Sequence, residues 1–402
     1  MEETKTAVAL CAVGAEKIVS NEVRKLGLKV IEGGFGKVRF NADLQGLYRA
    51  LIGLRAADRL LLEIASFEAL DFDALFEGVR HQPWEDYVPK NFGLRVEKVR
   101  TNRSMLRAET SIQAIVHKAA AERLCTKRGI NRLPESSGGS GPNAAQNIEE
   151  AELRVYIEKN QVSVLMDLSG EPLFKRGYRM SGGIAPLRET TAAAILLHSL
   201  WRRKFALYDP FCGSGTIVAE AAMFAWDLAP GLGRRFSLSQ LLIANRGVEK
   251  EVREEFLARV DFSRPICIGG SDLDTSAVAI ARGNMERAIA LAGGQNGKGG
   301  FTGKMPAFNV IPMEEAKAED SGAQSAGYIV TNPPYGRRLG DVEFAEKTYS
   351  EMRRLSGNFP GWKLVVITDH SGFESFFGRK ADSCREITNG AIQSFLYQYE
   401  KL

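Results

Sequence analysis

The part of the chain that follows Gly170 alternates apolar segments with helical segments, and this alternation limits the possible folds more than any other feature. Apolar runs end in "LYDPFCGSGT", "ICIGGSDLD" and "GYIVTNPPYG", with helical patterns between them. Further strands are expected at "WKLVVITDH" and "SFLYQYEKL". Strands that alternate with helices form a parallel, doubly wound sheet whose ligands bind at the carboxyl ends of the strands. We therefore expect an α/β fold with a ligand site where the first three runs end.

The preceding part of the chain has a different pattern, and the change lies near residues 155–170. Short strands and helices are mixed at a spacing typical of small α+β units. The stretch "AELRVYIEKNQVSVLMDLS" predicts a hairpin that turns near Lys159 and Asn160. Residues 134–147 form a polar, low-complexity loop. At 402 residues the chain is long for one core, so two or three domains are expected.

Composition excludes several classes of protein. The chain is 44% hydrophobic and 25% charged, which is typical of a globular protein, and no apolar run approaches the length of a membrane span. The start of the chain lacks the pattern of a secretory signal. Its five cysteines are scattered and do not cluster with its four histidines, so neither a disulfide framework nor a zinc site is expected. These observations indicate a cytoplasmic protein without a metal.

Positive charge is concentrated in residues 95–132. This stretch carries ten basic and three acidic residues, a local net charge of +7, whereas the whole chain has a net charge of +4. Such a concentration favours a polyanion partner, although a solvated helix face with a loop would have the same composition. The candidate nucleic-acid contacts are Arg95, Lys98, Arg100, Arg103, Arg107, Lys118, Lys127 and Arg128.

The glycine-rich run "DPFCGSGT" (209–216) follows the first of the apolar strands. Closely spaced glycines let a ligand approach the backbone and direct a helix N-terminus at it. The run lacks the Gly-Lys-Ser/Thr of a phosphate-binding loop. Asp272, at the end of the second strand, could accept hydrogen bonds from a ribose diol, and a helix-capping role is the alternative. The 57 residues between Gly215 and Asp272 exceed the usual spacing, so we expect an insertion, with "LAPGLGRRFSLSQLLIANRG" as its sequence.

The third strand ends in Asn332-Pro333-Pro334-Tyr335. Together with the glycine loop and Asp272, this elbow resembles the class I S-adenosylmethionine-dependent methyltransferases that act on an exocyclic amine. Such an amine is a poor nucleophile because its lone pair is delocalised into the base. Two acceptors that hold both N–H groups would aim the lone pair at the methyl group. The side chain of Asn332 and the carbonyl of Pro333, whose direction the prolines restrict, can be these acceptors, and Tyr335 offers a face for the extruded base.

Most of the chain resembles one group within that class, the THUMP-domain RNA methyltransferases of the bacterial 23S ribosomal RNA guanine-N2 type. The motifs that carry the resemblance are "LFKRGYR", "APLRETTAAAIL", "DPFCGSGTIVAEAA", "LAPG" and "TNPPYGRRL". The resemblance implies a ferredoxin-like domain over residues 1–60, a THUMP RNA-binding domain over 61–168 and a Rossmann-like methyltransferase domain over 169–402.

The resemblance also implies the site. The catalytic residues would be Asn332, Pro333, Pro334 and Tyr335. The residues around S-adenosylmethionine would be Pro186, Leu187, Asp209, Phe211, Gly213, Gly215, Thr216, Asp272, Leu273, Asp274, Met313, Glu314 and Asn332. Glu315 stands as an alternative to Glu314, and Cys212 is expected to be a packing residue.

The expected function is methyl transfer from S-adenosylmethionine to guanine N2 in 23S ribosomal RNA. The elbow also occurs in enzymes that act on adenine N6 of RNA or DNA, and these four residues do not discriminate. The THUMP-like part favours RNA, because it would be a separate platform that reads RNA shape. A noncatalytic RNA-binding factor in ribosome assembly is the alternative from another class.

Overall fold

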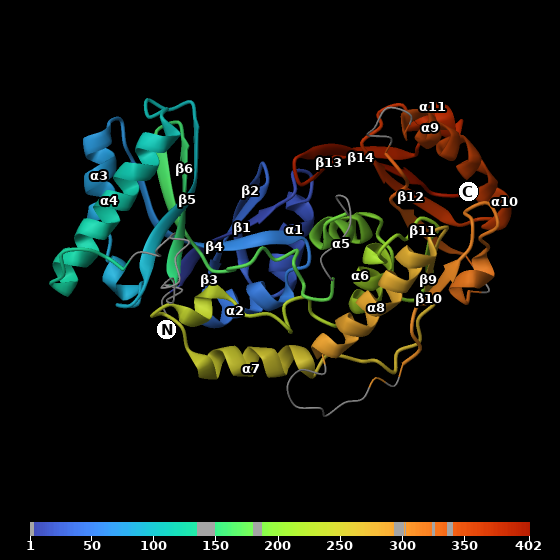
Figure 1. Cartoon of the computed structure of the whole chain (residues 1–402), viewed down its shortest axis with the longest axis horizontal. Helices are drawn as coiled ribbons and strands as arrows, with labels where there is room; N and C mark the ends of the chain where they lie inside the picture. Colours follow the sequence, from blue (N-terminus) through green and yellow to red (C-terminus); the bar gives the residue numbers. More distant parts are fainter. Residues whose placement is uncertain are drawn as a thin grey trace, which may run out of the picture.

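The computed structural model describes residues 4–134, 149–179, 187–292, 301, 303–323, 326–335 and 341–402. Two seven-stranded sheets form the body of the molecule, and Figure 1 shows them following one another along its long axis. The helices α3 (Phe72–Arg80) and α4 (Glu109–Arg128) lie at one end, and the C-terminal sheet with its helices lies at the other.

The N-terminal sheet has the strand order β2-β3-β1-β4-β7-β6-β5. Its strands are β1 (Lys5–Cys11), β2 (Lys29–Gly34), β3 (Lys37–Ala42), β4 (Ala57–Glu68), β5 (Gly93–Asn102), β6 (Glu150–Glu158) and β7 (Gln161–Asp167). Strand β4 pairs with β1 near its start and with β7 further along. The predicted domain boundary between residues 60 and 61 therefore falls inside a strand that both predicted units share.

The hairpin predicted for this sheet is confirmed. Lys159 and Asn160 both have positive φ and join β6 to β7, as a tight hairpin turn requires. The Gly-rich turn of "KVIEGGFGKVRF" joins β2 to β3. The helices α1 (Glu16–Lys25) and α2 (Leu44–Gly53) pack against β3, whereas α4 packs against β5 and α3.

The C-terminal sheet has the strand order β10-β9-β8-β11-β12-β14-β13. Its strands are β8 (Ala206–Asp209), β9 (Ile268–Asp272), β10 (Ala307–Val310), β11 (Gly327–Thr331), β12 (Lys363–Thr368), β13 (Ser383–Asn389) and β14 (Ile392–Tyr399). The first five in this order are parallel, and β14 runs antiparallel to β12 and β13. The expectation of a parallel sheet is therefore wrong for its last strands. The tight turn at Gly390, where φ is 66°, joins β13 directly to β14 and forces them to be antiparallel.

The C-terminal part also contains several helices. They are α5 (Glu189–His198), α6 (Thr216–Ala225), α7 (Arg246–Leu257), α8 (Thr275–Ala292), α9 (Asp341–Glu351), α10 (Leu355–Asn358) and α11 (Phe373–Phe377). Short 3₁₀ turns occupy Trp84–Asp86, Ser237–Gln240, Ala318–Ser321 and Met352–Arg354. Within the described ranges, no helix combines the length and the apolar character that crossing a membrane requires.

The expected insertion between α6 and β9 connects the two halves of the molecule. Its helix α7 packs against α2, and Arg49 of α2 lies 2.9 Å from Glu255 of α7. The N–H of Gly231 donates to the carbonyl of Ile52 at 2.9 Å. A Cβ at this glycine would lie 2.6 Å from the backbone of Leu51 and Ile52, so only glycine allows this approach.

The segment "LFKRGYR" links the two sheets through a buried guanidinium. Arg176 is 1% exposed and donates to the carbonyl of Arg55, in the N-terminal part, and to that of Leu173. Its Nε lies 3.3 Å from Glu220 of α6, which also accepts from the hydroxyl of Tyr178. Because each guanidinium contact belongs to a different segment, this arginine holds the C-terminal part against the N-terminal part.

Candidate active site

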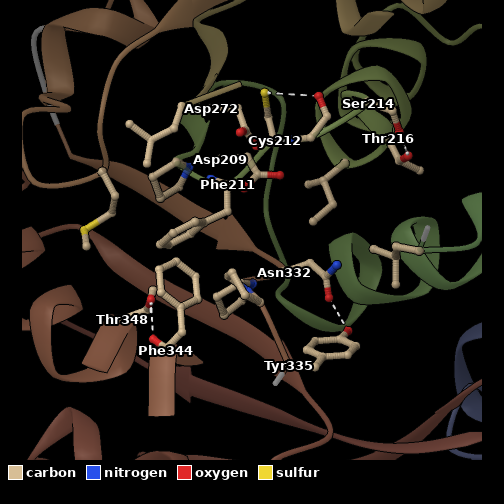
Figure 2. Close-up of a pocket in the computed structure, with 18 of the residues that line it drawn as sticks. Asp209, Phe211, Cys212, Ser214, Thr216, Asp272, Asn332, Tyr335, Phe344 and Thr348 are labelled. Atoms are coloured by element: carbon tan, nitrogen blue, oxygen red, sulfur yellow. Dashed lines mark hydrogen bonds between the residues drawn. The ribbon is translucent and has the colours of Figure 1, made fainter. Parts of the chain in front are cut away.

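A pocket of about 710 Å³ lies at the carboxyl ends of the parallel strands. It is lined by the segments that follow β8, β9, β10 and β11, by α9 and by the start of β14. The pocket therefore lies where the sequence predicted a ligand site, at the ends of the first three apolar runs. Figure 2 shows Asp209, Phe211 and Asp272 on one side of this pocket and Asn332 with Tyr335 on another.

The glycine loop after β8 forms the wall nearest α6. Gly213 and Gly215 have φ angles of 49° and 77°, which strongly favour glycine. A Cβ on Gly213 would meet no atom of the described residues within 4 Å, whereas a Cβ on Gly215 would lie 2.8 Å from Ala281 of α8. The first glycine thus leaves the backbone open, and the second lets the loop pack on α8. The Gly213 N–H donates to Asp272 at 2.9 Å, which joins the ends of β8 and β9.

Asp209 is a buried carboxyl at the end of β8. It is 1% exposed, and it accepts hydrogen bonds from the hydroxyl of Thr331 at 2.6 Å and from the N–H of Phe211 at 3.1 Å. Burial raises the pKa of Asp209 from 3.8 to about 7, although both hydrogen bonds favour the ionised form. Asp209 therefore changes charge close to neutral pH.

The elbow is anchored on both sides. Before it, Thr331 is fully buried and pairs with Val366 of β12. Near its end, the hydroxyl of Tyr349 on α9 donates to the carbonyl of Pro334 at 2.8 Å. The hydroxyl of Tyr335 donates to the side-chain oxygen of Asn332, and Figure 2 shows these two side chains pointing towards one another.

The structure brings most of the predicted site residues together. The elbow residues line the pocket with Leu187, Asp209, Phe211, Gly213, Thr216, Asp272, Leu273, Met313 and Glu314. Two predicted residues do not line it. Gly215 packs against α8, and Asp274 accepts from the N–H of Ser276 at the start of that helix. Pro186 lies outside the described residues.

The remaining two expectations concern Glu315 and Cys212. Glu314 lines the pocket, and its neighbour Glu315 does not. Cys212 also lines the pocket, but it is only 6% exposed, and burial raises the pKa of its thiol. A thiol that ionises poorly is a weak nucleophile, which agrees with a packing residue.

Sequence reasoning missed one wall of the pocket. Phe344, Thr348 and Glu351 line it from α9, at the i, i+4 and i+7 spacing of one helix face. The helix buries Ala345, Tyr349 and the following Met352 in the core instead. This spacing was visible in the sequence, but nothing showed that α9 would return to the loop ends. The other missed residues are Pro210, Ser214, Ile217 and Ile392.

Acidic residues, some of them from other segments, pair with part of the basic stretch. Arg95 pairs with Glu97, Glu150 and Glu152, at distances between 2.7 and 3.3 Å. Arg100 pairs with Glu109 at 2.8 Å. Two of these acids, Glu150 and Glu152, lie outside residues 95–132, so the net charge of the stretch overstates the positive field around Arg95.

The other predicted contacts differ in their surroundings. Lys127 lies 3.8 Å from Glu85, and Lys118 lies over the ring of Phe76. Arg128 donates to two backbone carbonyls, and burial lowers the pKa of Lys98. In contrast, Arg103 and Arg107 are exposed, and neither forms an ion pair within the described ranges. Both side chains are therefore accessible from solvent.

The lining of the pocket fits a nucleoside that carries a charged tail. Asp272 offers a carboxylate to hydroxyl groups, and Leu273, Met313 and Phe211 provide apolar walls for a planar base. The open backbone at Gly213 leaves room for a ligand beside Asp209. Among the described residues, no group of three or more His, Cys, Asp or Glu side chains is placed to hold a metal ion.

Comparison with known proteins assigns the fold to a family. A family model described as the RMKL-like methyltransferase domain matches residues 176–398. The chain belongs to this family. A second model, described as the RlmL ferredoxin-like domain, matches residues 6–61. The predicted fold class, an N-terminal ferredoxin-like part followed by a Rossmann-like methyltransferase domain, is thereby confirmed.

Relatives of this RMKL-like methyltransferase cover its whole length. The "Putative RNA methyltransferase YpsC" of Bacillus subtilis is 34% identical, over 98% of this chain and 95% of its own. The "Ribosomal RNA large subunit methyltransferase K/L" of Cellvibrio japonicus is 33% identical, over 97% of this chain and 50% of its own, so the chain spans about half of that relative. A crystal structure described as a putative methyltransferase complexed with SAH is 32% identical to this chain, with a TM-score of 0.84. The match covers 100% of this chain and 99% of that one. The cofactor is S-adenosylmethionine.

Proposed function

We propose that this RMKL-like methyltransferase transfers a methyl group to N2 of guanine in 23S ribosomal RNA. The observation that carries the proposal is the anchored elbow from Asn332 to Tyr335, which shares one pocket with Asp209 and Asp272. The printed names of the relatives, an RNA methyltransferase and a ribosomal RNA large subunit methyltransferase, support RNA as the substrate. A ribosomal RNA substrate would place the enzyme in the cytoplasm.

The proposed cofactor site is the wall formed by the segments after β8, β9 and β10. S-adenosylmethionine, when bound, supplies an electrophilic methyl group on a sulfonium sulfur and leaves as S-adenosylhomocysteine. Asp272 would accept hydrogen bonds from the ribose hydroxyls, and Leu273, Met313 and Phe211 would enclose the adenine. Asp209, when ionised, would attract the positively charged amino group.

The elbow would orient the target amine. The side-chain oxygen of Asn332 and the carbonyl of Pro333 would accept its two N–H groups, so that the nitrogen lone pair points towards the methyl group. The nitrogen uses this lone pair to form the bond to carbon and then releases one proton to solvent. Neutral acceptors suffice, because the proton leaves only after the bond has formed.

Tyr335 would contribute to this mechanism through both its hydroxyl and its ring. Its hydroxyl donates to the Asn332 oxygen, which is the atom that the target amine needs. An amide oxygen has two lone pairs, so Asn332 can accept from the target amine as well as from Tyr335. The ring would then support the extruded base by stacking.

The N-terminal half is proposed to be the RNA platform. We assign residues 1–60 to a ferredoxin-like domain, 61–168 to a THUMP domain and 169–402 to the methyltransferase domain. Of the predicted RNA contacts, Arg103 and Arg107 have the strongest support, because their charges are exposed and not compensated by an ion pair within the described part.

The test is nucleoside mass spectrometry of 23S, 16S and transfer RNA from cells with and without the gene, complemented with wild type or Asn332→Ala. Loss of N2-methylguanosine from 23S RNA is expected on deletion. In vitro, Asn332→Ala should lower the rate of methylation by about 100-fold, a cost typical of removing one preorganised group, with the RNA affinity nearly unchanged.

The control variant is Asn21→Ala, on the exposed face of α1, which should methylate like wild type. Loss of N6-methyladenine instead would keep the mechanism and overturn the guanine substrate. Full activity of Asn332→Ala would overturn the role of the elbow.

A further inference from the structure

Tyr349 connects α9 to the elbow. The side chain is fully buried, and its hydroxyl donates to the carbonyl of Pro334 at 2.8 Å. Its ring packs against Phe373 and His370 with centroid distances of 5.0 and 5.6 Å. The tyrosine is therefore held in one orientation, and its polar atom touches the segment that is proposed to orient the substrate.

The hydroxyl of Tyr349 also lies 3.0 Å from that of Thr368, at the end of β12. A carbonyl can only accept, so the single proton of Tyr349 is committed to Pro334. Thr368 must then donate to the oxygen of Tyr349. The Thr368 oxygen in turn accepts from the N–H of His370 at 3.1 Å. The result is a chain of three hydrogen bonds, all in the same direction, that begins at the backbone after β12 and ends at the elbow.

Two properties make this chain a firm support. Hydrogen bonds in a series polarise one another and gain strength in a buried environment. Burial also raises the pKa of Tyr349 to about 12, so its hydroxyl keeps its proton at every pH at which the enzyme would work.

These three hydrogen bonds stabilise the part of the elbow that strand pairing does not hold. β11 anchors the backbone up to Thr331, and the two prolines restrict the φ angles that follow. The carbonyl direction of Pro334 would otherwise be free to vary by rotation about ψ. With that carbonyl bound to Tyr349, the carbonyl of Pro333 remains for the target amine.

We propose that Tyr349 is a positioning residue, which sets the aim of Asn332 and Pro333 through its hydrogen bond to Pro334. This inference rests on the proposed function, since it assumes that the elbow orients an amine. It adds a residue that touches neither substrate nor cofactor.

The test compares Tyr349→Phe with Tyr397→Phe. Both tyrosines are buried in the same aromatic cluster and donate to a backbone carbonyl, but that of Tyr397 belongs to Ser371, away from the pocket. We expect Tyr349→Phe to lower the single-turnover rate of methyl transfer by about 5- to 30-fold, as the loss of one hydrogen bond implies. The KM for RNA and the affinity for S-adenosylhomocysteine should change less than about twofold. Tyr397→Phe should retain the wild-type rate.

A second variant tests the chain itself. Thr368→Val should lower the rate by a smaller factor in the wild-type background and have no further effect in Tyr349→Phe. Additive effects of the two substitutions would overturn the proposal that Thr368 acts through the hydroxyl of Tyr349.

Each remaining outcome has one meaning. A wild-type rate for Tyr349→Phe would overturn the inference, and so would an equal loss in Tyr397→Phe, because the cluster would then matter only for stability. If wild type methylates a base amine while Tyr349→Phe is unaffected, only this inference fails. If wild type methylates no RNA at all, the proposed function fails and the inference fails with it.

Discussion

At the scale of single residues, Asp209 is a buried carboxyl in the wall of the pocket. Its pKa of about 7 in the folded protein exceeds the ordinary value of 3.8, because burial disfavours the charged form. Between these two values the unfolded chain has lost the proton that the folded protein retains. Stability that is fully present below pH 3.8 is therefore lost progressively as the pH rises to about 7.

Asp209→Asn removes this titration and keeps an oxygen for Thr331 and Phe211. In thermal unfolding of the protein without ligand, the melting temperature of the variant should rise relative to wild type between pH 4 and 7, and the difference should level off above that range. A constant difference across the range would show that Asp209 does not titrate there.

At the scale of an element, the loop between β8 and α6 depends on two glycines with different surroundings. Gly215→Ala combines a positive φ with a contact of 2.8 Å to Ala281, whereas Gly213→Ala meets only the positive φ. Backbone strain should cost Gly213→Ala about 1–2 kcal/mol, and overpacking should cost Gly215→Ala about 1–3 kcal/mol more. Urea denaturation of both variants measures the difference in the free energy of unfolding, and equal losses would contradict the close packing of this loop on α8.

At the scale of the whole molecule, the proposed RNA substrate would contact Arg103 and Arg107 of the N-terminal half as well as the elbow of the C-terminal half. Replacing Arg103 and Arg107 together by Ala should weaken RNA binding and lower the salt slope by about 1–2, because each phosphate contact releases about one counterion. The matched control is Arg95→Ala with Arg100→Ala, which removes the same charge from side chains that are already paired with acids. Filter binding at several salt concentrations measures both slopes. If the control changed the salt slope by the same amount, arginines that are paired with acids would contact RNA as well as the unpaired ones do.

Features that depend on residues close together in the sequence could be predicted from it, whereas contacts between residues far apart in the sequence required the tertiary structure. The sequence by itself determined the parallel strands, the glycine loop, the Asp272 position and the elbow, because each depends on neighbours in the chain: alternating apolar runs, positive φ at glycine, and the rigidity of two prolines. Only the tertiary structure decided that β4 is shared between two predicted units, that β14 returns antiparallel, and that α9 forms a wall of the pocket. It also decided that Glu150 and Glu152 neutralise Arg95 and that Tyr349 holds Pro334. These contacts join segments that are separate in the sequence, and their partners become defined only when strand pairing and core packing place them side by side.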